Sequence, residues 1–259
     1  MTCLRARSLA LLLEPDPDRK AAATLALDLD APLDAAAVLA DPGGVPGRPA
    51  RPELVPHTAL KQRPVGTPEG RAGLLHSLAH IEFNAVNLAL DIVWRFPGLP
   101  EAFYRQWLRI AQEEALHFSL LRDHLRSLGT AYGDFPAHGA LWEMAEKTKH
   151  DLLARLALVP RTLEARGLDA SPAVKAKLVG AGDRRAGEIL DIILRDEIGH
   201  VAVGNHWYRQ QCAARGLDPL ATYAELATRH GAPRLRGPFN LEARRAAGFD
   251  EDELRALQA

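Results

Sequence analysis

The sequence has very little cysteine and no long hydrophobic run. Its two cysteines, Cys3 and Cys212, are too few for a disulfide framework and do not have the spacing of a zinc-binding pair. No stretch approaches the roughly 18 apolar residues that a membrane-spanning helix requires. The apolar run Leu9–Leu13 ends at Glu14-Pro15, without the small residues of a signal-peptide cleavage site. These absences predict a cytoplasmic protein with free thiols and no membrane span.

The sequence also lacks an excess of charge of either sign. It contains 32 basic and 33 acidic residues, which gives a formal charge of -1. Proteins that bind nucleic acid as their main partner usually carry a positive excess, so the totals do not indicate such a partner. The hydrophobic content of 47% and the charged content of 25% are typical of a globular protein. A length of 259 residues is enough for one large domain or two small ones.

The central part of the sequence lacks the alternating pattern of a half-buried strand. Over residues 69–216, apolar residues instead recur at helical spacing in a sequence rich in Ala, Leu, Arg and Glu. Thr67 followed by Pro68 is a typical helix start, Pro160 predicts a kink, and Ser171 predicts a helix cap. We expect four long helices at about 68–96, 100–128, 138–166 and 183–215, and a short one at about 172–179.

The two flanking segments are less regular. Residues 1–68 combine one or two short helices, separated by Pro15 and Pro17, with a proline-rich wrapping segment. Residues 217–259 read as a helical tail of short pieces at about 219–230, 241–247 and 250–257. The predicted fold is therefore all-α, a four-helix bundle over 69–216 with additional short helices at both ends.

The pattern Glu-x-x-His occurs twice, as Glu114-Ala-Leu-His117 and as Glu197-Ile-Gly-His200. Residues three apart on a helix share one face, so each pair offers a carboxylate and an imidazole to the same point. One such pair is weak evidence, because both residue types are common in helices. Both pairs, however, interrupt the apolar stripe of a predicted bundle helix. Carboxylates buried there need a compensating charge, which a cation supplies.

A single glutamate interrupts the apolar stripe of each of the other two helices. These residues are Glu82 in the first helix and Glu164 in the third. Their offsets to the next Glu-x-x-His are nearly equal, 114 - 82 = 32 and 197 - 164 = 33 residues. Two antiparallel hairpins of this kind would bring six groups to one level, as in di-iron and di-manganese carboxylate bundles. The predicted metal ligands are Glu82, Glu114, His117, Glu164, Glu197 and His200.

The ligand types suggest both the metal and the roles of the side chains. Mixed oxygen and nitrogen ligands suit iron or manganese, whereas zinc usually takes fewer ligands. We therefore expect two metal ions, with iron preferred, bridged by Glu114 and Glu197, with Glu82 and Glu164 as terminal ligands and an imidazole at the outer side of each metal. The preceding acids Glu113 and Asp196 either accept hydrogen bonds from the metal-bound histidines or are solvated surface residues.

Two aromatic residues near the predicted ligands have simpler explanations. His80 lies two residues from Glu82 and so on nearly the opposite side of its helix, where we expect a hydrogen-bonded packing residue. Tyr208 follows His200 by about two turns, and we expect a buried amphipathic aromatic, with a redox-active or substrate-gating phenol as the alternative.

With these residues in hand, the sequence resembles an uncharacterised bacterial ferritin-like family known as domain of unknown function 455, over about residues 60–250. The matching segments are Ala79-His-Ile-Glu82, Glu113-Glu-Ala-Leu-His117, Leu163-Glu-Ala-Arg-Gly167, Asp196-Glu-Ile-Gly-His200 and Gly237-Pro-Phe-Asn240. The resemblance implies a ferritin-like bundle. The wider relatives of the family include di-iron hydroxylases, one of which acts on a modified tRNA adenosine, so it also implies a relation to oxygen-activating enzymes.

Several functions are compatible with such a site. We expect an oxygen-dependent oxidase or hydroxylase that uses an electron donor and acts on a small or RNA-borne substrate, as a monomer or small homo-oligomer. No motif identifies the substrate, a catalytic residue, or a cofactor other than the metals. The alternatives are a non-catalytic iron-binding or metal-stabilised protein, and manganese chemistry on peroxide. The sequence lacks the repeated surface acids of a mineralising cage, which argues against iron storage.

Overall fold

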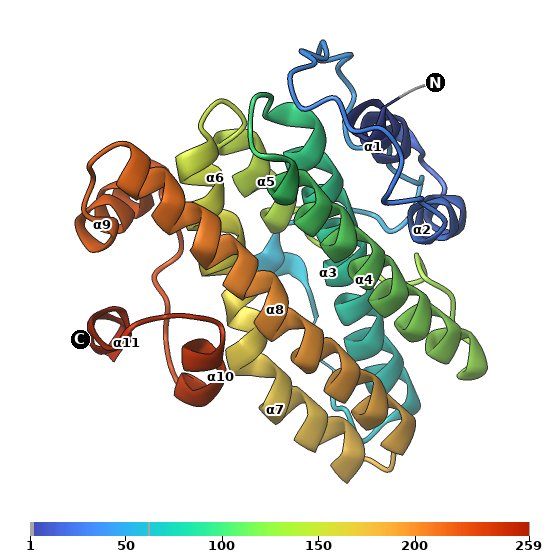
Figure 1. Ribbon diagram of the computed structural model, residues 1–259. Helices are drawn as coiled ribbons and strands as arrows, with labels where there is room; N and C mark the ends of the chain where they lie inside the picture. The colour runs from blue at the N-terminus through green and yellow to red at the C-terminus, as the bar shows by residue number, and fades with distance from the viewer. Residues whose placement is uncertain (1–2, 62, 259) are drawn as a thin grey trace. The chain divides into compact units, whose positions relative to one another are not determined.

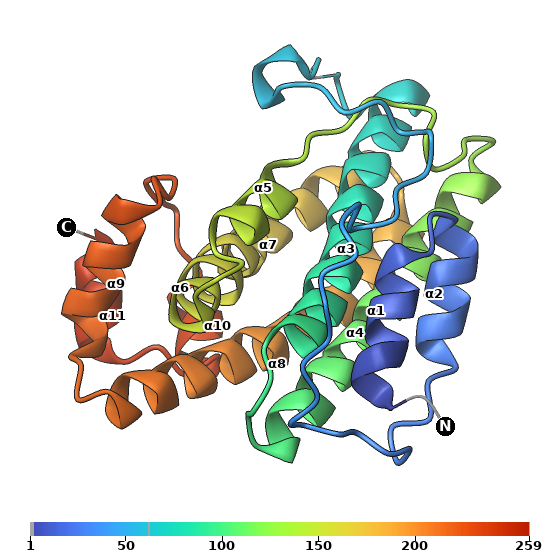
Figure 2. The same ribbon diagram turned by 90° about the horizontal axis from the view of Figure 1, so that it is seen from above.

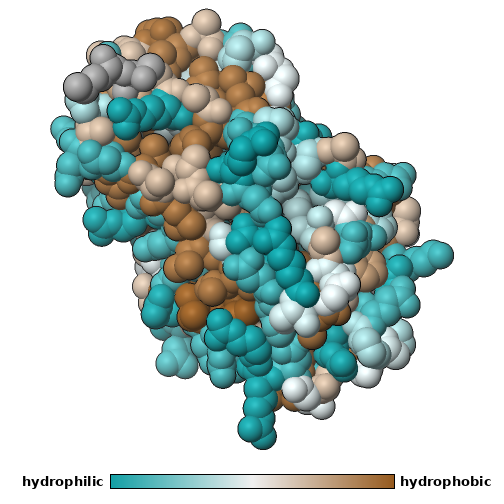
Figure 3. All heavy atoms as spheres, turned by 90° about the vertical axis from the view of Figure 1, so that its right-hand side faces the viewer, coloured by the Kyte–Doolittle hydropathy of each residue, from teal (hydrophilic) through white to brown (hydrophobic). Residues whose placement is uncertain are grey.

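The computed structural model describes residues 3–61 and 63–258, and the regular secondary structure in these ranges is helical (Figure 1). The all-α class is therefore confirmed. Among the described residues, no helix is long and apolar enough to cross a membrane. Hydrophilic side chains are spread over much of the face shown in Figure 3. The chain divides into two compact units: unit 1 comprises Met1–Ala140 and Ala181–Ile189, and unit 2 comprises Leu141–Gly180 and Leu190–Ala259.

Unit 1 is built on two long helices, α3 (Pro68–Arg95) and α4 (Glu101–Ser127), which pack side by side (Figures 1 and 2). As predicted, α3 begins after Thr67, whose side chain accepts the N–H of Gly70 at 3.1 Å. The helix α4 ends just before Gly129, which has a φ of 75°. Glycine adopts this left-handed conformation without the steric cost of a Cβ atom, so it ends the helix.

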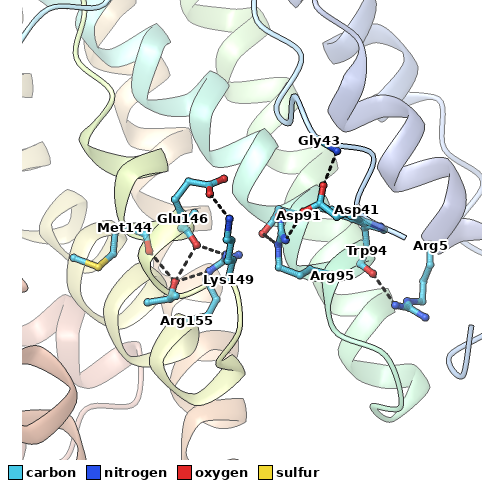
Figure 4. Close-up of polar contacts among 12 residues, drawn as sticks. Arg5, Asp41, Gly43, Asp91, Trp94, Arg95, Met144, Glu146, Lys149 and Arg155 are labelled. Atoms are coloured by element: carbon cyan, nitrogen blue, oxygen red, sulfur yellow. Dashed lines mark hydrogen bonds and ion pairs between the residues drawn. The ribbon is translucent and has the colours of Figure 1, made fainter. Parts of the chain in front are cut away.

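Two short helices precede this pair, as the prolines near residue 16 predicted. The first, α1 (Leu4–Leu13), packs against α3, and the second, α2 (Pro17–Leu25), packs against α4. The buried Arg5 reaches the end of α3, where its guanidinium donates to the carbonyl oxygens of Val93 at 3.0 Å and Trp94 at 2.6 Å (Figure 4). It thereby satisfies carbonyl groups that have no partner within the helix.

The proline-rich segment between α2 and α3 is irregular, apart from one 3₁₀ turn, η1 (His57–Ala59), in its described residues. It is attached to the rest of unit 1 by an isolated bridge between Leu54 and Ala137. The N–H of Val55 donates to Ala137 at 2.8 Å, and the N–H of Ala137 donates to Glu53 at 2.9 Å. These bonds hold the segment next to the loop that follows α4.

The region expected to form one helix over 138–166 is divided, so that expectation is wrong. It consists of α5 (Ala140–Lys147), α6 (Leu152–Leu158) and the start of a further helical stretch. Asp151 begins α6 as a cap, and its carboxylate accepts the N–H groups of Leu153 at 2.9 Å and Ala154 at 3.3 Å. A capping residue of this kind marks the start of a new helix, so the chain turns between α5 and α6. Lys149 pairs with Glu146 in the preceding turn at 3.1 Å (Figure 4).

Pro160 lies in a π-helical turn, η2 (Val159–Glu164), that follows α6 directly. Proline has no N–H group and cannot donate to the carbonyl four residues earlier. In η2 the bonds instead reach back five residues: the N–H of Ala165 donates to Pro160, and the Thr162 hydroxyl group donates to Ala157 at 2.9 Å. Short π-helical turns occur frequently at functional sites, and this one ends at Glu164.

The helix α7 (Ala165–Gly180) continues through Pro172, so the separate short helix expected at 172–179 is also wrong. Pro172 leaves the Leu168 carbonyl without its helical donor, and the Asn240 side chain supplies one at 3.2 Å. Ser171 is not a cap, because its hydroxyl group donates to the Gly167 carbonyl at 2.7 Å within the helix.

The remaining helices agree with the sequence-based expectation. They are α8 (Arg184–Ala214), α9 (Pro219–Arg229), α10 (Leu241–Ala246) and α11 (Glu251–Gln258). Asp183 caps α8 by accepting the N–H of Ala186 at 2.9 Å. In unit 2, buried side chains of α7, α8 and the C-terminal tail form one hydrophobic cluster that includes Leu168, Val201 and Phe249. This cluster holds the tail against the helices that carry the predicted ligands of unit 2.

Candidate metal centre

Three of the predicted ligands meet in the core of unit 1. The helix α3 supplies Glu82, and α4 supplies Glu114 and His117 one turn apart. The Nδ1 atom of His117 lies 3.2 Å from Oε2 of Glu82 and 3.4 Å from Oε2 of Glu114. Potential ligand atoms of all three side chains lie within 4.8 Å of one another, so the group could hold a metal ion. These three residues are named the unit 1 half-site.

The unit 1 half-site is buried, and this shifts its proton equilibria. The exposed fractions are 6% for Glu82, 1% for Glu114 and 0% for His117. Burial raises the pKa of Glu82 to about 7, although its hydrogen bond with His117 opposes the shift. Burial alone would lower the pKa of His117, but hydrogen bonds to Glu114 and Glu82 outweigh it and raise that pKa to about 11. With both carboxylates ionised, the trio is negative even when the imidazole is protonated, and a cation would offset that charge.

The other three predicted ligands belong to unit 2. Glu197 and His200 lie one turn apart on α8, with 3.4 Å between Oε1 and Nδ1, and their exposed fractions are 7% and 1%. Glu164 is the last residue of η2 and is half-buried. A Cβ atom at Gly167, three residues after Glu164, would lie 4.0 Å from Oε2 of Glu197. The start of α7 therefore runs next to the predicted ligands of α8. Glu164, Glu197 and His200 are named the unit 2 half-site.

A glycine on α8 allows η2 to approach closely. A Cβ atom at Gly204 would lie only 2.5 Å from the Cβ atom of Pro160, a separation that side chains do not tolerate. The π-helical turn and α8 can therefore pack in this way only with glycine at that position. Sequence periodicity places Gly204 on the buried stripe of its helix but does not indicate its partner.

The two acids that precede the predicted ligand glutamates of α8 and α4, Asp196 and Glu113, are half-buried. Asp196 accepts a hydrogen bond from Nε of Arg195 at 2.8 Å. Glu113 occupies the equivalent position on α4. A hydrogen bond from a metal-bound histidine to either acid stays a prediction.

Histidines of α3 are hydrogen-bonded to the loop after α4. His80 is hydrogen-bonded as expected, with Nδ1 2.8 Å from the Tyr132 hydroxyl group and Nε2 3.2 Å from the His138 carbonyl oxygen. Nε2 of His76 accepts the backbone N–H of Gly133 at 2.9 Å. Sequence reasoning did not foresee the role of His76, although a spacing of four residues places both histidines on one helix face.

A buried arginine of η2 connects the unit 2 half-site to the C-terminal tail. Nη2 of Arg161 donates to Oε1 of Glu253 at 2.6 Å, and its guanidinium lies 4.3 Å from the centre of the Tyr208 ring. Tyr208 is buried, as expected, and its hydroxyl group donates to the Pro219 carbonyl at 2.7 Å. No sequence motif identifies Arg161, because its partner Glu253 lies far along the chain.

Comparison with known proteins places the chain in a family. Residues 13–255 match the family described as "Protein of unknown function (DUF455)", so the chain belongs to that family. An uncharacterized protein of Haemophilus influenzae is 50% identical over 213 residues, which covers 80% of this chain and 74% of that protein. No solved structure matches the chain. The family predicted from the motifs is thus confirmed, whereas its ferritin-like relationship remains a proposal.

Proposed function

We propose that the two half-sites together form one two-metal centre in a ferritin-like four-helix arrangement, with iron as the preferred metal. The proposed ligands are Glu82, Glu114, His117, Glu164, Glu197 and His200. The observation that carries this proposal is the unit 1 half-site, in which three buried ionisable side chains have ligand atoms within 4.8 Å of one another. Such a group is costly in a protein core unless a cation offsets its charge.

The unit 2 half-site supports the proposal because it repeats the same residue types in the same chain order. Each half-site offers two carboxylates and one imidazole, so the full set has four carboxylates and two imidazoles. Four ionised carboxylates would balance the charge of two divalent cations. Ligands of this kind suit iron or manganese and match the bundle-core pattern of di-metal carboxylate proteins.

We further propose that the centre serves an oxygen-dependent oxidase or hydroxylase. When bound, iron would supply the capacity to react with dioxygen, which side chains alone lack. The chain's own residues hold the ligands in a buried position: Glu82, Glu114 and His117 are 6%, 1% and 0% exposed. A substrate and an electron donor are the implied partners.

Metal analysis tests the centre directly. The full chain, loaded anaerobically with ferrous iron and freed of excess metal, should retain two irons per chain by mass spectrometry of the metal. Glu114→Gln, which removes a proposed bridge, should lower the content to well below one. Glu101→Gln is the matched control, because Glu101 lies on the same helix and is exposed. Retention of one iron by each half-site independently of the other would contradict a shared centre.

Oxygen consumption tests the proposed reactivity. The iron-loaded protein with a chemical reductant should consume dioxygen faster than the same amount of free iron, and Glu114→Gln should lose this excess. Stable binding of two irons without any excess consumption would instead favour the non-catalytic, metal-stabilised alternative.

A further inference from the structure

Unit 1 contains a small cavity beside α3 that the metal ligands do not line. Its volume is about 40 Å³. The α3 residues that line it are His80, Phe83, Asn84 and Asn87, which recur at the spacing of one helix face. The cavity is large enough for about three water molecules, or for a chemical group of three or four heavy atoms.

The proline-rich segment forms the facing wall of the cavity. Pro46, Pro49 and Pro52 line it, together with Arg48. Proline fixes its own φ angle and restricts the residue before it, so this wall has few conformations to lose when a ligand binds. The bridge at Leu54, which also lines the cavity, ties the same segment to the loop after α4.

The charge of the cavity comes from one side chain. Arg48 is the charged member of its lining, and no acidic residue is among them. In the described ranges, no protein group accepts a hydrogen bond from the Arg48 guanidinium. The nearby Lys20 is committed elsewhere, since its Nζ donates to Oδ1 of Asn87 at 2.6 Å and burial lowers its pKa to about 7. Arg48 therefore provides the persistent positive charge at neutral pH.

The uncharged polar groups of the cavity are held in fixed positions. The Tyr132 hydroxyl group is 2.8 Å from Nδ1 of His80, and Nδ2 of Asn84 donates to the His80 carbonyl oxygen at 2.8 Å. The Lys20 bond described above fixes the Asn87 amide. A cavity with a single unpaired guanidinium and several immobilised neutral polar groups is suited to a small anion with one charge.

We propose that this cavity binds the carboxylate group of a small organic acid, with Arg48 as its counter-ion. The planar guanidinium fork matches the two oxygens of a carboxylate, and the volume accepts that group with a short stem. A phosphate dianion would require a second cation or more donors than the lining provides. The proposal goes beyond the metal centre and does not rest on it, because none of the six proposed metal ligands lines the cavity.

An NMR titration of the full chain with sodium acetate tests this proposal, with sodium chloride as the ionic-strength control. In the wild type, the side-chain amide signals of Asn84 and Asn87 should shift saturably with acetate and not with chloride. Arg48→Gln should weaken acetate binding at least tenfold, and Arg48→Lys should weaken it less. Arg51→Gln is the matched control: Arg51 is an exposed residue of the same segment that does not line the cavity, so acetate affinity should be unchanged.

Three outcomes would overturn the proposal. These are equal acetate affinity in wild type and Arg48→Gln, equal effects of acetate and chloride, or tighter binding of inorganic phosphate than of acetate. Arg48 is exposed, so the variants should fold, and thermal unfolding followed by circular dichroism checks this. Metal content is measured on the same samples, so that the two proposals are tested separately. A protein that binds acetate but no metal would contradict the metal centre and not the carboxylate site.

Discussion

Glu82, Glu114 and His117 occupy core positions of α3 and α4, where apolar side chains would cost far less to bury. Burying an ionised carboxylate costs about several kcal/mol of folding free energy, unless the group takes up a proton instead. The raised pKa of Glu82 reflects this cost. At the residue scale, side chains that cost this much to bury are kept in a core when they have a chemical function. The same reasoning makes Glu114→Gln, a nearly isosteric change, a sharp test of metal binding.

The buried histidines of α3 predict acid sensitivity in unit 1. Burial lowers the pKa of His76 to about 4 from an ordinary value of 6.5. Nε2 of His76 accepts a backbone N–H and loses that bond on protonation. The unfolded chain therefore binds more protons between these two pH values. The stability contributed by the neutral ring is present above pH 6.5 and is lost as the pH falls toward 4, by about 3 kcal/mol.

Urea unfolding at several pH values measures this effect. His76→Gln retains an acceptor near the position of Nε2 but does not titrate, so its stability should fall less steeply between pH 6.5 and pH 4. His150→Gln is the control, because His150 is exposed and its replacement should leave the slope unchanged. Equal slopes in wild type and His76→Gln would show that His76 does not take up a proton on unfolding.

At the scale of elements, the unit 2 half-site depends on how η2 packs on α8. The π-helical turn carries Glu164 at its end, and it lies against Gly204 through Pro160. Arg161 holds the same turn to the tail through Glu253. The position of Glu164 is therefore set by contacts with residues distant in sequence, and not by the turn alone.

Gly204→Ala should push η2 away from α8. The new methyl group would lie 2.5 Å from the Pro160 Cβ atom, and overpacking of this kind costs about 1–3 kcal/mol. We expect a lower denaturation midpoint and weaker iron retention. Gly199→Ala is the matched control on the same helix: nothing lies within 4 Å of its new methyl group, so helix propensity should stabilise it by about 0.5–1 kcal/mol. An unchanged midpoint in Gly204→Ala would show that η2 moves aside at no cost.

At the scale of the whole molecule, the proposed centre would take ligands from both units. Metal that binds only the folded state stabilises it, by about 4 kcal/mol at a metal concentration 1,000 times the Kd. If both units supply ligands, iron loading should raise the unfolding temperature of both and merge their transitions into one. Calorimetry of the metal-free and iron-loaded full chain measures this. A shift confined to one transition would contradict the shared centre.

Much of the helical framework could be predicted because its signals are local. Thr67, Asp183 and Gly129 are caps and stops whose effect depends on neighbouring residues, and α3, α4 and α8 begin and end close to the expected positions. The third predicted helix divides at Asp151, which begins α6 as a cap. The separate short helix predicted at 172–179 is wrong for the opposite reason: whether Pro172 breaks a helix depends on which group replaces the lost hydrogen bond, and that group is the distant Asn240.

The sequence by itself determined the all-α class and the family, and it predicted the residues of each half-site, because helical periodicity shows which polar side chains fall on a buried face. The meeting of Glu82 with the Glu114–His117 pair needed the packing of α3 on α4. Only the tertiary structure decided the π-helical turn before Glu164, the need for glycine at position 204, and the Arg48 cavity. Each of these depends on atoms brought together from distant parts of the chain, and periodicity carries no information about such contacts.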